Sequence, residues 1–173
     1  MKKLLSISLV VFGLAVMAKA QEPVNPSFRK GPAGMVEIGT LFNQGYSGSY
    51  VSVSSGYNVL HGLFTGAGIG VKNQKFLSPG VNSFLVPVFA QVRYSLLNKK
   101  FSPFIDLKAG LLADCTRSVK SPVSPYPDNN IGHFFKGAVG VDYKHFSLSV
   151  GDDWGTVGGS GKYGWTVGLS YRF

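Results

Sequence analysis

The chain has 173 residues, enough for one domain, and a formal net charge of +9. Only 14% of its residues are charged, against about a quarter in a typical soluble domain, which argues against a soluble enzyme. The many aromatic and apolar residues exclude a disordered chain, and the single cysteine, Cys115, excludes an internal disulfide.

The N-terminus has the three parts of a secretory signal peptide. Two lysines precede a short apolar run at 4–17, and small residues follow in a small-x-small pattern at 18–20. The apolar run is too short for a membrane-spanning helix, which needs about 20 residues. We therefore expect residues 1–20 to be a cleaved signal peptide. The proline-containing residues 21–32 should then form a flexible periplasmic lead-in to one β-barrel domain, residues 33–173.

Beyond the lead-in, apolar residues recur with a period of two, which predicts strands and no helix. The predicted strands are residues 34–43, 50–58, 62–72, 83–97, 101–114, 132–143, a short seventh at 146–150, and 165–173. Short connections at 59–61, 98–100 and 144–145 alternate with long ones at 44–49, 73–82, 116–131 and 151–163. Outer-membrane barrels have this alternation, with short periplasmic turns and longer external loops.

Charged residues fall on only one side of each predicted strand. Arg93, for example, alternates with Val92 and Tyr94. A soluble sandwich would bury the apolar side, but the signal peptide indicates export and favours contact of that side with lipid. Strands in hydrocarbon must close on themselves, because no other partner satisfies their backbone groups. We therefore predict an all-β fold, an eight-stranded antiparallel up-and-down transmembrane β-barrel located in the outer membrane.

Aromatic residues lie near the strand ends on the apolar side. A tilted strand crosses an apolar band about 25 Å tall in roughly ten residues, which matches the spacing of the rings on each strand. We expect two interfacial aromatic girdles formed by Phe84, Tyr94, Phe135, Tyr143, Trp165 and Tyr171.

Four segments in order along the chain carry a family resemblance. They are SGYN at 55–58, FTGAGIG at 64–70, PVFAQVRY at 87–94 and SPFIDLKAG at 102–110. This order resembles the bacterial outer-membrane protein β-barrel domain family, a porin-like superfamily with the architecture of the OmpA and OmpX barrels. The resemblance implies the barrel and no biochemical role. The alternation of Leu169, Tyr171 and Phe173 also resembles the terminal signal read by the barrel-assembly machinery, which would be a partner during insertion.

The charged side of the strands should face the barrel interior. An eight-stranded barrel is largely filled by side chains, so it is a poor pore, and charges in that low-dielectric space should pair. We expect Glu37 to pair with Arg172 and Arg93 with Asp106. The predicted interior network comprises Glu37, Arg93, Asp106, Lys108, Lys136, Asp142 and Arg172.

A basic cluster is expected near the external rim. Lys72, Lys75, Arg117 and Lys120 would lie where the phosphates of lipopolysaccharide sit and could bind them. The alternative is ordinary solvated loop charge. Outer-membrane lipid and lipopolysaccharide are the expected partners of a monomer, and nucleic acid is excluded for an exported chain with no basic helix.

The sequence favours a structural or interaction role for a barrel that presents four external loops to an unknown partner. No catalytic residue, metal site or cofactor is expected. A narrow small-solute or ion channel is the first alternative, and a lipid A-modifying enzyme is the second. For the enzyme, only His133 with Ser121, Ser124 and Asp128 of the adjoining loop could supply a triad, and their spacing is not diagnostic.

Overall fold

The structure is a computed structural model that describes residues 25–43, 45–76, 82–115, 131–157 and 160–173. The predicted signal peptide lies outside the described residues. No helix in these ranges is long and apolar enough to span a membrane. The elements are η1 (Pro26–Phe28), β1 (Gly31–Asn43), β2 (Tyr46–Leu60), β3 (Leu63–Phe76), β4 (Asn82–Ser95), β5 (Phe101–Asp114), β6 (Ile131–Tyr143), β7 (Phe146–Val157) and β8 (Ser160–Arg172).

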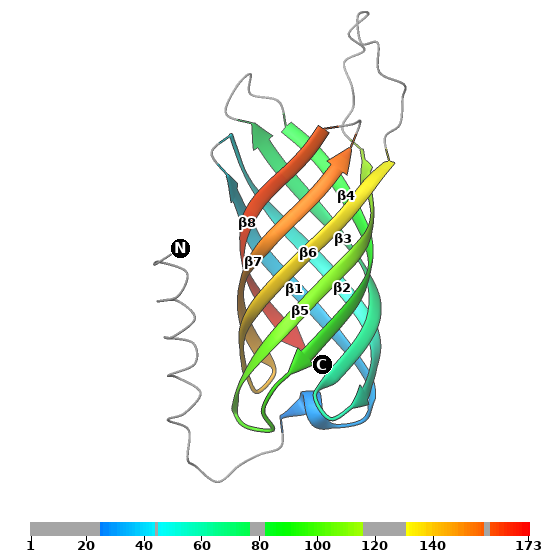
Figure 1. Ribbon diagram of the computed structural model, residues 1–173, viewed down its shortest axis with the longest axis vertical. Helices are drawn as coiled ribbons and strands as arrows, with labels where there is room; N and C mark the ends of the chain where they lie inside the picture. Colours follow the sequence, from blue (N-terminus) through cyan, green and yellow to red (C-terminus); the bar gives the residue numbers. More distant parts are fainter. Residues whose placement is uncertain (1–24, 44, 77–81, 116–130, 158–159) are drawn as a thin grey trace, which may run out of the picture.

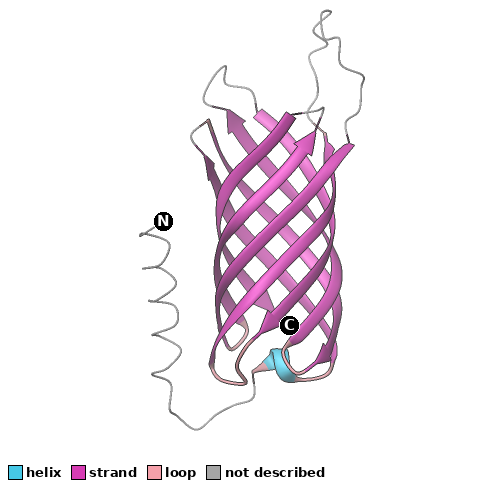
Figure 2. Ribbon diagram, viewed as in Figure 1, coloured by secondary structure: helices cyan, strands magenta, loops and turns pink. Residues whose placement is uncertain are grey.

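The eight strands form one closed barrel in which each strand pairs antiparallel with its neighbours in sequence (Figure 1). β1 and β8 close the ladder, with Val36 opposite Tyr171 and Ile38 opposite Leu169. Figure 2 shows strand along the whole wall and, among the described residues, helix only in the single turn of η1. The prediction of an all-β, eight-stranded, up-and-down antiparallel barrel is confirmed.

The two ends of the barrel differ. At one end, here called the turn end, residues 61–62, 96–100 and 144–145 join β2 to β3, β4 to β5 and β6 to β7. Gly62 and Lys144 adopt positive φ angles of 84° and 56° there, which lets the chain reverse within two residues. η1 and the C-terminus also lie at the turn end, at the bottom of Figure 1. The opposite end is the loop end.

Three predicted loops are wrong, because the strands run further toward the loop end than expected. β7 continues to Val157 instead of ending at residue 150, β3 continues to Phe76, and β2 begins at Tyr46. The glycine and aspartate residues after position 150 resemble a loop in sequence. They stay in the strand because every second one faces the interior, where Asp153 finds a cationic partner.

The wall has a polar interior and an apolar exterior. Successive residues of β1 show the alternation, since Glu37 is 4% exposed and Ile38 is 50% exposed. On β4, Arg93 is 1% exposed, whereas Val92 is 47% exposed. The side that the sequence marks as apolar is therefore the outer face, and the buried core of this protein is mainly polar.

Glycines make room for large inward side chains. A Cβ built at Gly39 would lie 2.6 Å from the Tyr50 ring, and one at Gly68 would lie 2.7 Å from the Phe89 ring. At Gly140 an added Cβ would lie 2.6 Å from Cζ of Phe104 and would also meet the backbone oxygen of Leu148. Since the space inside an eight-stranded barrel is small, these inward glycines are a packing requirement.

We predict that Gly140→Ala lowers the free energy of unfolding by about 1–3 kcal/mol, because the new methyl group overpacks the interior. Gly137→Ala, on the same strand, is the matched control, since its Cβ would meet only Leu107 and Phe135 side-chain atoms at 3.7 and 3.8 Å. Urea unfolding of both variants in detergent micelles, followed by tryptophan fluorescence, measures the difference. Equal stability of the two variants would contradict the packing argument.

Candidate functional site

The candidate site is the charged interior, where side chains from opposite walls of the barrel meet. Glu37 on β1 accepts hydrogen bonds from Lys108 on β5, through Oε2, and from Lys136 on β6, through Oε1 at 2.6 Å. The Tyr50 hydroxyl donates to the same Oε1, also at 2.6 Å. One carboxylate thus joins three strands other than its own across the lumen.

Glu37 also offsets a repulsion between like charges. Lys108 and Lys136 are direct partners in the β5–β6 register, so two ammonium groups would otherwise lie side by side. Like charges directly opposite each other destabilise a sheet, and burial would increase the cost. The Glu37 carboxylate binds both lysines, which makes their proximity tolerable.

Arg93 on β4 makes a second connection, closer to the turn end. Its Nη2 donates to Asp142 and, at 2.7 Å, to Ser147 Oγ, and its Nη1 lies 3.5 Å from Ser170 Oγ on β8. The guanidinium carbon lies 3.5 Å from the centre of the Phe104 ring, a cation–π contact. A single arginine on β4 therefore contacts four other strands, β5 to β8, inside the barrel.

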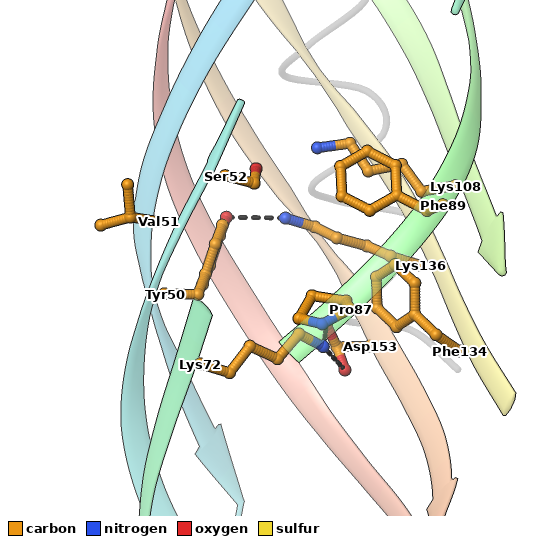
Figure 3. A pocket seen from close by; sticks show the side chains of 10 residues that line it. All are labelled: Tyr50, Val51, Ser52, Lys72, Pro87, Phe89, Lys108, Phe134, Lys136 and Asp153. Carbon is orange, nitrogen blue, oxygen red and sulfur yellow. Dashed lines mark hydrogen bonds and ion pairs between the residues drawn. The ribbon is translucent and has the colours of Figure 1, made fainter. Parts of the chain in front are cut away.

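Lys72 and Asp153 form a third connection, between β3 and β7, nearer the loop end (Figure 3). The ammonium nitrogen lies 2.7 and 2.5 Å from the two carboxylate oxygens and 4.1 Å from the centre of the Phe134 ring. A small cavity remains between this pair and Lys136, with a volume of about 10 Å³, which is about the space of one water molecule.

The N-terminal segment covers the mouth at the turn end. Ser27 Oγ lies 3.1 Å from Ser95 Oγ and accepts a hydrogen bond from Arg172, and the Ser27 carbonyl accepts from the Gly62 amide at 3.2 Å. The backbone N–H of Asn25 donates to Asn98 Oδ1 at 3.1 Å. Of the expected lead-in, residues 25–30 hydrogen-bond at the barrel mouth and residues 31–32 already belong to β1.

All seven residues of the predicted interior network are buried in the barrel, at 1–4% exposure. The two predicted pairings are wrong. Arg172 lies at the mouth and reaches Ser27, while Glu37 lies deeper, between the lysines. Arg93 and Asp106 are register partners, yet the long arginine crosses the lumen to Asp142, and Asp106 accepts a hydrogen bond from Gln91 at 2.8 Å.

The predicted rim cluster is wrong for Lys72. Because β3 continues past this residue, Lys72 has an inward position, is 3% exposed and pairs with Asp153. Lys75 is exposed at the loop end, which leaves its binding role a prediction. Arg117 and Lys120 lie outside the described residues. Two members of the interior network, Tyr50 and Asp153, were not predicted from the sequence. Both occupy inward-facing alternate positions, which becomes clear once the full lengths of β2 and β7 are known.

The outer face carries aromatic rings at both ends. The six predicted girdle residues are 43–46% exposed, and further exposed rings at the strand ends are Phe42, Tyr57, Phe101, Phe146, Trp154 and Tyr163. At the turn end Phe101 and Tyr143 have ring centroids 4.7 Å apart. Leu169, Tyr171 and Phe173 also face outward, and Phe173 exchanges backbone hydrogen bonds of 2.9 and 3.0 Å with Gly34. Recognition of these three by the assembly machinery stays a prediction.

The residues considered for catalysis are placed only in part. His133 is exposed on β6, and its backbone N–H donates to Thr156 Oγ1 at 3.3 Å. Ser121, Ser124 and Asp128 lie outside the described residues. Within the described ranges, no three His, Cys, Asp or Glu side chains are grouped as they would be to hold a metal ion.

No family model and no curated protein matches the sequence, whereas four solved structures match the fold. The crystal structure of the outer membrane enzyme PagL is similar with a TM-score of 0.59 and 12% identity, over 80% of this chain and 98% of that one. The N-terminal β-barrel domain of Pseudomonas aeruginosa OprF gives a TM-score of 0.47 and 14% identity, over 84% of this chain and 100% of that one. At such identities the likeness is one of fold.

We predict that Glu37→Gln destabilises the barrel by about 3–5 kcal/mol, the cost typical of breaking a buried ion pair, because Lys108 and Lys136 lose their shared carboxylate. The double variant Glu37→Gln, Lys136→Met should recover part of this loss, since it removes one of the two adjacent ammonium groups. Urea unfolding of the single and double variants provides the comparison. An unchanged midpoint for Glu37→Gln would contradict the role assigned to this carboxylate.

Proposed function

We propose that this chain is an integral barrel of the bacterial outer membrane with a structural or interaction role, exposing four loops on one side. The observation that carries the proposal is the apolar outer face. It continues around all eight strands, with exposed residues such as Ile38, Val53, Val88, Leu111 and Leu169, each 45–54% exposed.

Such a surface is incompatible with water. Soluble monomers rarely expose continuous apolar patches larger than a few hundred Å², and each Å² costs about 25 cal/mol in water. Lipid removes this cost, and the closed ladder leaves no strand edge unpaired within the hydrocarbon. The aromatic rings at both strand ends support the same reading, because Trp and Tyr favour the interfaces of a bilayer.

The difference between the two ends supports an orientation. Outer-membrane barrels have short turns on the periplasmic side and longer connections outside. We therefore assign the turn end, with η1 and the C-terminus, to the periplasm, and the loop end to the exterior. The predicted signal peptide at residues 1–20 would direct the export across the inner membrane that this location requires.

The interior favours a structural role over solute passage. Three sets of ion pairs cross the lumen, and η1 covers one mouth, so little continuous space is left for a solute. The likeness to PagL concerns the fold and transfers no catalytic residue. Presentation of the loop end to a partner is therefore the role that best fits a closed and rigid wall.

We predict that the cost of a charge on the outer face depends on depth. Val88 lies midway between the rings of Phe84 and Tyr94, so Val88→Lys should lower the free energy of unfolding in lipid vesicles by about 2–4 kcal/mol. Leu96 lies beyond Tyr94, so Leu96→Lys should lower it by only about 0–1 kcal/mol. Reversible unfolding in vesicles measures both variants. Equal costs at the two depths would contradict insertion in a bilayer.

We predict that the wild-type protein shows no large steady conductance in planar bilayers, because Arg93 and its partners occupy the lumen. A general porin in the same bilayers is the positive control. We also expect a deletion strain to keep its lipid A mass profile. A stable open channel would favour solute passage, and an altered lipid A profile would favour a lipid-modifying enzyme.

A further inference from the structure

Basic side chains surround the turn end. Arg29 and Lys30 precede β1 and are exposed, Lys100 lies half-buried in the β4–β5 turn, and Lys144 is exposed in the β6–β7 turn. The Lys144 amide donates to the Lys100 carbonyl at 3.2 Å, which holds these two turns next to each other. The four residues, here called the basic rim, come from three different connections around the circumference.

Two members of the basic rim, Lys100 and Lys144, lie at the edge of the apolar belt. Lys100 precedes Phe101, and Lys144 follows Tyr143, whose rings contact each other on the outer face. The Lys144 ammonium lies 5.7 Å from the centre of the Tyr143 ring. In a bilayer the aromatic girdle sits at headgroup depth, so the ammonium groups beside it lie at the level of the lipid phosphates.

Acidic side chains do not offset the basic rim. Asp106 and Asp142, the aspartates of the strands at this end, are buried at 4% and 2% exposure and are engaged within the lumen. Among the described residues of the turn end, no Asp or Glu side chain is exposed. The rim therefore presents positive charge to its surroundings.

We propose that the basic rim binds the headgroups of anionic phospholipids in the leaflet at the turn end. The proposal rests on the proposed membrane insertion and adds a lipid preference to it. The spread of the charges around the barrel suits a planar layer of headgroups better than one small ligand. Their depth beside the girdle favours lipid over a soluble acidic protein, which would approach beyond the headgroups.

Each basic group near a membrane surface changes the preference for anionic lipid by about fivefold. The test uses the full barrel in nanodiscs of phosphatidylcholine with a minor fraction of phosphatidylglycerol, and native mass spectrometry counts the lipids retained after release. The test variant is Arg29→Gln, Lys30→Gln, Lys100→Gln, Lys144→Gln. Lys162→Gln, on β8 at the loop end, is the matched control.

Wild type and Lys162→Gln should retain phosphatidylglycerol over phosphatidylcholine, and the fourfold variant should lose at least tenfold of this preference. Equal retention by the fourfold variant overturns the proposal, as does tighter binding of the wild type to soluble polyglutamate than to phosphatidylglycerol vesicles. Heat-modifiable migration after folding into phosphatidylcholine alone reports insertion separately. Failure of that step for every variant would contradict the proposed function itself.

Discussion

The narrow lumen of an eight-stranded barrel is the constraint on which the rest of this structure depends. Side chains from opposite walls must touch, and an ionised group placed inside must find its counter-ion across the lumen. Glu37 reaches from β1 to Lys108 on β5, and Lys72 reaches from β3 to Asp153 on β7. Because these contacts connect strands that are not neighbours in the wall, they fix the shape of the barrel more strongly than the ladder alone.

The polar interior also accounts for the apolar outer face of the barrel. A soluble protein gains stability by burying apolar surface, but here the buried positions are largely polar and the apolar positions face out. The folded state therefore requires an apolar environment around its outer face, which the proposed bilayer would supply. Two inward rings stabilise buried charges through cation–π contacts, Phe104 with Arg93 and Phe134 with Lys72.

Much of the fold could be predicted from the sequence because apolar and polar residues alternate with a period of two along every strand. Partners inside the barrel could not be predicted in the same way. Register places Arg93 opposite Asp106, but the arginine side chain is long enough to bind Asp142 instead. The end of β7 was missed for a related reason: inward Asp153 resembles a loop residue until its pairing with Lys72 across the lumen is known.

The position of Ser27 implies an order of events during folding of the barrel. Its partners Ser95 and Arg172 belong to β4 and β8, and the second of these lies 145 positions further along the chain. The full set of hydrogen bonds to Ser27 can therefore form only once β8 is in place. A chain stalled before barrel closure would lack part of this hydrogen bonding, so the segment around Ser27 would be more open to proteolysis.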